Sequence, residues 1–169
     1  ESLRVIKQVA DAFLTFQKLD LCDENGNKYH VIHRDLKPDN ILFHKNKVKL
    51  ADFGFAKFIP EEEESLQHSR LGTYTYMAPQ ILANEKYNAK CDIWSAGIIL
   101  YQLIFGRVPW MFYTPMSYYN EIKKDCLQFP KPITDETKDL IKGMLTLEEN
   151  NRLSWTEVYS HPALKDIKI

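Results

Sequence analysis

Cysteine, glycine and unbroken apolar sequence are all scarce in this chain of 169 residues, and each scarcity excludes a class of protein. The three cysteines are widely separated and show no C-x-x-C spacing, which argues against a disulfide framework and a zinc site and favours a reducing compartment. The longest apolar stretch, residues 98–105, is interrupted by Gln102 and is far too short to span a bilayer. None of the six glycines lies two positions from another, so no G-x-G-x-x-G nucleotide-binding motif is present.

Net charge is nearly absent as well. The chain has 22 Lys and Arg against 23 Asp and Glu, and a net charge of -1 gives no electrostatic reason to expect a nucleic acid or an anionic membrane as partner. A chain of this length suffices for one domain that buries roughly 70% of its unfolded surface. No secretory segment is visible at the start. We therefore expect one intracellular, cytoplasmic unit over residues 1–169.

Helical periodicity dominates what is present. The segment 92–105 is apolar on almost every side and is followed by Gly106, which predicts a central buried helix with a glycine cap. Two short apolar runs, 41–43 and 48–50, flank a polar turn and predict a pair of strands. Further helices are predicted by amphipathic patterns over 3–19, 117–127 and 135–147, and by a capping-box pattern at Ser154 and Glu157.

A short polar loop over residues 33–40 brings together side chains of unlike chemistry. It carries a carboxylate at Asp35, an ammonium at Lys37 and a carboxamide at Asn40. Pro38 fixes its own φ and biases the residue before it towards an extended conformation, so the segment favours a shaped loop over a helix. These three polar groups would then face one point.

Two further motifs follow this loop at fixed distances. The loop reads HRDLKPDN, residues 52–54 read DFG, and residues 78–80 read APQ. The predicted hairpin would hold Asn40 and Asp52 at the same end. Taken singly, Asp and Asn are common turn residues. Taken together and in this order, the motifs resemble the signature set of a eukaryotic serine/threonine protein kinase, HRDLxxxN, DFG and APE. Similarity of the loops also hints at the calmodulin-dependent or Unc-51-like branches.

The resemblance implies the C-terminal, large lobe of a kinase, an α+β and mostly α-helical fold with short β-hairpins at the catalytic cleft. It implies transfer of the ATP γ-phosphate to Ser or Thr hydroxyls of a protein substrate, with ATP and Mg²⁺ as cofactors. Asp35 would accept the proton of the substrate hydroxyl, and Lys37 would lie near the transferred phosphate. The nucleotide and its Mg²⁺ would be held by the remaining matched residues, Asn40, Leu42 and Asp52, with Asn40 and Asp52 as the metal ligands.

The resemblance also assigns supporting and regulatory residues. His33 and Phe53 would pack beneath the site, and Asp92 would hold the backbone of the catalytic loop. Arg34 marks kinases that are regulated by phosphorylation of the segment 52–80, either by an activating kinase or by autophosphorylation. The candidate sites in that segment are Ser65, Ser69, Thr73 and Thr75, of which Thr73 also matches a structural threonine of the family.

Gln80 departs from the family pattern. A glutamate at this place pairs in the family with a buried arginine, which Arg152 matches here. A glutamine oxygen can still accept one charge-assisted hydrogen bond, so the fold should survive. From the sequence alone, Gln80→Glu would be expected to raise the melting temperature.

The larger departure concerns the N-terminal, nucleotide-binding lobe of a kinase. Only 32 residues precede His33, and most of them are predicted to form a helix, so this lobe is expected to be absent. Because misplacing a substrate by about 1 Å can cost ~100-fold in rate, the isolated chain is expected to have negligible activity. The alternative is a non-catalytic interaction module, either a truncated kinase or a pseudokinase.

Overall fold

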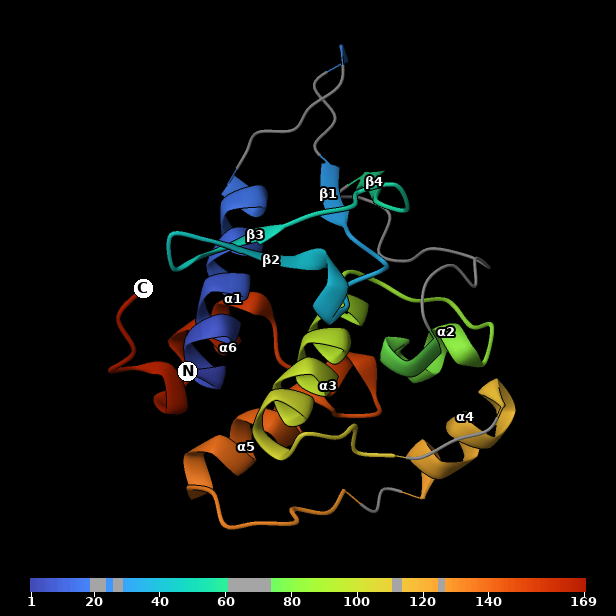
Figure 1. Cartoon of the computed structure of the whole chain (residues 1–169). Helices are drawn as coiled ribbons and strands as arrows, with labels where there is room; N and C mark the ends of the chain where they lie inside the picture. Colours follow the sequence, from blue (N-terminus) through green and yellow to red (C-terminus); the bar gives the residue numbers. More distant parts are fainter. Residues whose placement is uncertain (19–23, 26–28, 61–73, 111–113, 125–126) are drawn as a thin grey trace.

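The centre of the structure is helix α3 (Cys91–Phe105), around which the other helices are arranged (Figure 1). The structure is a computed structural model that describes residues 1–18, 24–25, 29–60, 74–110, 114–124 and 127–169. Every side chain of α3 from Cys91 to Tyr101 is buried, as expected for a helix that is apolar on all sides. The helix ends at Gly106, whose left-handed φ of 73° lets its N–H reach the Gln102 carbonyl at 2.8 Å. The predicted central helix and its glycine cap are confirmed.

The surrounding helices bury one face each against α3 or against one another. The first helix, α1 (Ser2–Lys18), packs against α3 and against α6 (Trp155–Ser160), and Phe13 stacks on Trp155 with ring centroids 4.3 Å apart. The other helices are α2 (Pro79–Leu82), α4 (Pro115–Lys123) and α5 (Asp135–Met144). In the described part of the chain, no helix is both long enough and apolar enough to cross a bilayer.

Local hydrogen bonds, of a kind that the sequence predicts, determine where helices α4 and α6 begin. At α6 the Ser154 hydroxyl accepts the N–H of Glu157, and the Glu157 side chain accepts the N–H of Ser154, so the predicted capping box is confirmed. The helix α4 begins two residues earlier than predicted, because Thr114 caps it through Ser117. Such caps satisfy the backbone donors that the first turn of a helix leaves unpaired.

The predicted hairpin consists of β2 (Ile41–His44) and β3 (Lys47–Leu50), which pair antiparallel with Ile41 opposite Leu50. Its turn has only two residues, Lys45 and Asn46, with φ values of 48° and 63°. A two-residue turn with both φ values positive matches the natural twist of a hairpin. The Gln8 side chain of α1 accepts the Val48 N–H at 2.9 Å, which fixes the hairpin to the helical body.

A second strand pair was not predicted. Strand β1 (Tyr29–Ile32) pairs antiparallel with β4 (Lys57–Pro60), with Ile32 opposite Lys57. No tight turn connects these strands, since the loop 33–40 and the whole hairpin lie between them (Figure 1). The fold is therefore mostly helical with few short strands, arranged as two separate two-stranded sheets in the described residues.

Gly97 allows close packing between α3 and the end of α5. A Cβ atom at this position would lie 2.8 Å from Cδ2 of Leu145 and 3.0 Å from Cβ of Met144, both tighter than ordinary contact. We predict that Gly97→Ala lowers the free energy of unfolding in urea by about 1–3 kcal/mol through overpacking. Lys142→Ala, on the exposed side of α5, is the control and should change it by less than ~0.5 kcal/mol. A stabilised Gly97→Ala variant, as helix propensity alone would give, would contradict this packing.

Candidate active site

The loop 33–40 is held from below by the first turn of α3. The Asp92 carboxylate is buried and accepts the backbone N–H of His33 at 2.8 Å and that of Arg34 at 2.9 Å, one on each oxygen. Burial raises the pKa of Asp92, and the hydrogen bonds from the two amides oppose that rise. Arg34 has a φ of 66°, a left-handed backbone that few residues with a side chain adopt. The predicted role of Asp92 in tying down the loop is confirmed.

Three of the predicted site residues meet in this loop. The Lys37 ammonium lies 2.8 Å from Oδ2 of Asp35, and the Asn40 amide donates to the Asp35 carbonyl at 2.8 Å. The same Asn40 nitrogen lies 3.4 Å from Oδ2 of Asp35, a carboxylate whose side chain is only 2% exposed. The Lys37 ammonium and the Asn40 side-chain amide therefore both lie within hydrogen-bond distance of the buried Asp35 carboxylate.

Local backbone geometry explains this convergence. Lys37 is extended, with φ of -150° and ψ of 165°, as expected for a residue before proline. Pro38–Asn40 then forms a single 3-10 turn, closed by the Asn40 N–H on the Lys37 carbonyl at 3.0 Å. The prediction of a shaped loop in place of a helix is confirmed, and a proline suits the start of the short turn because its missing N–H is not needed there.

The pKa of Lys37 is raised, chiefly by its hydrogen bond to Asp35 and further by the charges of Asp35, Asp39 and Asp52. Its ammonium thus stays charged while it contacts the buried carboxylate.

Asp52 follows strand β3, at the end of the hairpin where the loop 33–40 runs into β2. The Ala51 N–H donates to the Asn40 carbonyl at 2.9 Å, which continues the strand pairing up to the site. Asp52 is exposed, has a left-handed φ of 59°, and accepts the Gly54 N–H on Oδ1 at 3.2 Å. No hydrogen bond in the described residues joins it to Asp35 or Asn40. Proximity at one end of the hairpin, rather than contact, is what relates Asp52 to the loop.

The donor set suits a hard cation. The amide nitrogen of Asn40 is engaged with Asp35, which leaves its oxygen without a hydrogen bond in the described part of the chain, and the same holds for Oδ2 of Asp52. Carboxylate and amide oxygens are ligands of Mg²⁺, which takes one or two protein groups and keeps water or phosphate oxygens for the rest. The residues present therefore fit a Mg²⁺ ion that also binds a phosphate.

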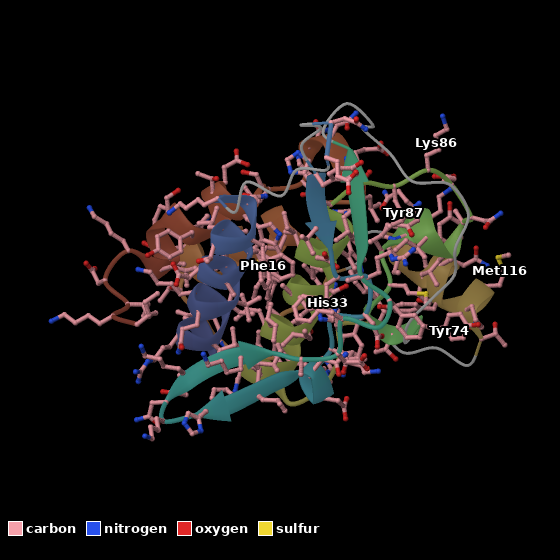
Figure 2. All side chains as sticks on the ribbon, turned by 90° about the horizontal axis from the view of Figure 1, so that it is seen from above. Phe16, His33, Tyr74, Lys86, Tyr87 and Met116 are labelled. Atoms are coloured by element: carbon pink, nitrogen blue, oxygen red, sulfur yellow. The ribbon has the colours of Figure 1, made fainter. Side chains whose placement is uncertain are left out.

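Aromatic rings support the site from beneath. His33 is buried, its Nε2 lies 3.0 Å from the Ala51 carbonyl, and its ring lies 4.9 Å from that of Phe53. Phe53 in turn meets Phe16 of α1 edge to face at 5.6 Å. Figure 2 shows His33 in the middle of the molecule, between Phe16 on one side and Tyr74 on the other. His33 and Phe53 thus have the packing role predicted for them.

Leu42 takes a different place from the other predicted residues. It lies on β2 and is 52% exposed, and its neighbour Phe43 is 60% exposed. The hairpin therefore leaves about half of each of these two apolar side chains open to solvent.

Comparison with known proteins gives this geometry its context. A family model described as the protein kinase domain matches residues 15–164. The chain belongs to the protein kinase family. It is 38% identical to serine/threonine-protein kinase ATG1 of Eremothecium gossypii over 78% of this chain and 16% of that protein. It is 39% identical to serine/threonine-protein kinase PDK1 of Cryptococcus neoformans over 81% of this chain and 12% of that protein.

A third relative of this kinase-family chain is the calcium/calmodulin-dependent protein kinase type II alpha chain of Drosophila melanogaster. It is 36% identical over 86% of this chain and 28% of that protein. The resemblance to serine/threonine kinases is thus confirmed. The chain spans less than a third of the length of each of these three relatives.

The sequence did not predict the side chains that hold the segment just before α2. Ser95 donates to the Tyr76 carbonyl at 2.8 Å, and Tyr118 of α4 donates to the Thr75 carbonyl at 2.6 Å. Tyr76 lines one small cavity together with Asp35, so this segment forms a wall beside the loop. The sequence feature that could have indicated the Ser95 contact is a polar residue one helical turn after Asp92 in an otherwise apolar helix.

Part of the predicted regulatory segment lies outside the described residues. Ser65, Ser69 and Thr73 belong to that part. Of the candidate phosphorylation sites only Thr75 is described. Arg34 is described, and its Nε donates to the Phe55 carbonyl.

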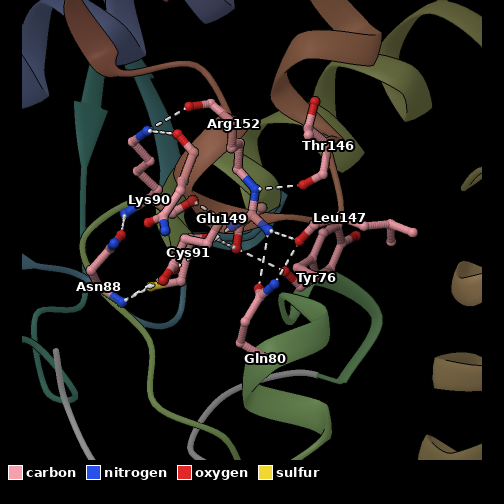
Figure 3. A network of polar contacts seen from close by, with 11 residues as sticks. Tyr76, Gln80, Asn88, Lys90, Cys91, Thr146, Leu147, Glu149 and Arg152 are labelled. Atoms are coloured by element: carbon pink, nitrogen blue, oxygen red, sulfur yellow. Dashed lines mark hydrogen bonds and ion pairs between the residues drawn. The ribbon is translucent and has the colours of Figure 1, made fainter.

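The predicted partnership of Gln80 and Arg152 is confirmed (Figure 3). The Arg152 side chain is fully buried, and its Nη2 donates to Oε1 of Gln80 at 3.0 Å. The Gln80 amide nitrogen donates in turn to the Leu147 carbonyl at 2.6 Å. The oxygen and the nitrogen of the Gln80 side-chain amide therefore each form a hydrogen bond.

Removing the charge of Asp92 tests the support of the loop. Asparagine keeps one acceptor oxygen but presents an NH₂ group to the second amide, so one buried N–H loses its partner. We predict that Asp92→Asn lowers the free energy of unfolding by about 1–3 kcal/mol, measured by urea denaturation. Asp135→Asn removes the same charge from a fully exposed residue at the start of α5 and should have little effect. Equal stability of the two variants would show that the Asp92 carboxylate does not hold the loop.

Proposed function

We propose that the chain, over residues 1–169, is the C-terminal lobe of a serine/threonine protein kinase and takes part in transfer of the ATP γ-phosphate to Ser or Thr hydroxyls of proteins. The observation that carries this proposal is the convergence of Lys37 and Asn40 on the buried carboxylate of Asp35 in a kinase-family chain. Phosphoryl transfer asks a protein mainly for positioning and for charge stabilisation, and this loop offers both.

Each residue has a role that follows from its contacts. Asp35 accepts the proton of the substrate hydroxyl, and Lys37, which is charged and hydrogen-bonded to it, stabilises negative charge on the transferred group. Asn40 and Asp52 would hold a Mg²⁺ ion through their oxygens. When bound, Mg²⁺-ATP would supply the transferable phosphoryl group. Leu42 would contact the nucleotide.

A nucleotide-binding lobe is needed to complete the site, and we propose that it packs on exposed apolar side chains of the hairpin and of the residues that follow it. Leu42, Phe43, Phe53 and Phe55 are all exposed large apolar side chains on or next to the hairpin. Without a glycine loop and a lysine clamp, a nucleotide would lack contacts to its phosphates.

Partners follow from the proposed activity. The substrate is a protein, and no nucleic acid or membrane is expected as partner because the net charge is only -1. Phosphorylation within residues 52–80, by another kinase or by the protein itself, would place a phosphate in reach of Arg34. The expected location remains cytoplasmic.

A non-catalytic interaction module is the second candidate. The exposed apolar side chains favour it, since a contiguous apolar surface marks an interaction site whether or not catalysis occurs. An intact Asp35, Asn40 and Asp52 favour the enzyme, since a module has no need of metal-binding oxygens. Binding of a metal-bound nucleotide at these residues discriminates between the two.

Paramagnetic Mn²⁺ in complex with ATP provides that test in the isolated chain. We predict that it broadens the NMR amide signals of Asn40, a proposed metal ligand, and of Phe53, which follows the second proposed ligand, Asp52. Asp52→Asn should weaken this binding about 10–100-fold, because one charge-assisted contact contributes about 1.5–3 kcal/mol. Asp39→Asn, which removes an exposed carboxylate beside Asn40, is the control and should bind as the natural chain does. Broadening that is equally strong in Asp52→Asn and in the natural chain would favour the interaction module.

The isolated chain should also show negligible phosphoryl transfer to a serine- or threonine-containing peptide. The reason is the lack of contacts that align the nucleotide, since small misplacements already reduce rates ~100-fold. Radiolabelled ATP measures this directly. A turnover above background that disappears in Asp35→Asn would show that this lobe needs no second one.

A further inference from the structure

Arg152 is a buried cation whose hydrogen-bond acceptors are all neutral. Its five N–H groups are spread over Nε, Nη1 and Nη2, and the acceptors are the carbonyls of Lys90, Thr146 and Leu147 and the amide oxygen of Gln80. Its guanidinium also lies over the Trp94 ring, 5.1 Å from the centroid. A fully buried charge that meets only neutral groups is strongly disfavoured unless a counter-charge lies near.

Glu149 is the carboxylate that lies within 4 Å of this guanidinium in the described part of the chain. Its Oε1 is 3.9 Å from Nη1 of Arg152, and its own side chain is only 13% exposed. Both of its oxygens also accept the Asn88 N–H, at 3.1 and 3.2 Å. Burial raises the pKa of Glu149, whereas the Asn88 amide and the Arg152 charge lower it. Burial lowers the pKa of Arg152 to about 10, against the attraction of Glu149.

We propose that Glu149, rather than residue 80, supplies the counter-charge of Arg152, and that this pair positions the start of α3 and thereby the loop 33–40. Glu149 is then a positioning residue, since it lies outside the candidate site. The inference rests on the proposed function only for what the positioned loop does, because the geometry itself needs no reaction.

The path from Glu149 to the loop consists of hydrogen bonds. The turn Glu149–Asn151 is braced against residues 88–90, because Lys90 donates through its ammonium to the carbonyls of Asn150 at 3.1 Å and Arg152 at 2.7 Å. In the opposite direction, Nη1 of Arg152 donates to the Lys90 carbonyl at 3.1 Å (Figure 3).

The next residues of the chain carry this bracing into the site. Two positions after Lys90, Asp92 holds the amides of His33 and Arg34. The Glu149 carboxylate therefore binds the backbone at residue 88, the Lys90 ammonium binds the backbone at residues 150 and 152, and α3, which begins at the next residue, holds the loop.

The glutamine at position 80 is consistent with this arrangement. Its amide nitrogen donates to the Leu147 carbonyl at 2.6 Å, so a glutamate would turn a carboxylate oxygen towards that carbonyl. A second carboxylate would also be redundant beside Glu149. The stabilisation expected from the sequence for Gln80→Glu is therefore not expected in the natural chain, and it should emerge only when the charge of Glu149 is removed.

A cycle of three variants tests the proposal: Glu149→Gln, Gln80→Glu and the double variant. The measurement is hydrogen exchange of single amides by NMR on the full chain. In Glu149→Gln we expect the amides of His33 and Arg34 to exchange about tenfold faster, the equivalent of one lost charge-assisted bond. The Gly106 amide, at the other end of α3, should change far less. Glu148→Gln, an exposed neighbour with the same chemistry, is the matched control and should leave all these rates unchanged.

Rescue separates positioning from a merely structural role. Gln80→Glu should slow the exchange of His33 and Arg34 in the Glu149→Gln background and should not slow it in the natural background. If Glu149→Gln fails to fold, the double variant must fold. Failure of both variants, equal effects of Glu149→Gln and Glu148→Gln, or equal acceleration at Gly106 would each overturn the proposal. Because no step requires nucleotide or catalysis, these outcomes are independent of the Mn²⁺-ATP test of the proposed function.

Discussion

Two adjacent backbone amides bound by one buried carboxylate are the constraint on which the site depends. Arg34 has a left-handed backbone, which costs about 1–3 kcal/mol and persists only where the surroundings determine it. The Asp92 carboxylate stabilises this backbone conformation, because each hydrogen bond to a charged group contributes about 1.5–3 kcal/mol. Because Asp92 lies in the buried part of helix α3, Cys91–Tyr101, the loop is anchored to the core.

The site is assembled by backbone supports more than by mutual attraction of its side chains. The loop brings its own three groups together through a proline-led turn, whereas Asp52 arrives separately at the end of a hairpin that Gln8 fixes to α1. Asp52 has a left-handed φ, as Arg34 has, and each of the two residues follows a strand within two positions of its end. Leu42 and Phe43 of the same hairpin are more than half exposed.

Features determined by local sequence were predictable, and those determined by distant contacts were not. The central helix, the hairpin and the Ser154 cap follow from periodicity and capping patterns within a few residues. The β1–β4 pair was missed because its strands are joined through the loop and the hairpin, and no turn signal connects them. The motifs predicted a chemical role for Asp35, but the tertiary structure was needed for its contacts with Lys37 and Asn40, and for the proximity of Glu149 to Arg152.

The Asp92 carboxylate holds the loop 33–40 through the amides of His33 and Arg34. Couplings transmitted across hydrogen bonds can be measured by NMR, and they report directly on which amide is bonded to which acceptor. The account predicts couplings from the amide nitrogens of both His33 and Arg34 to the side-chain carboxyl carbon of Asp92. Absence of both couplings, with the two amides exchanging as freely as in an unfolded chain, would contradict it.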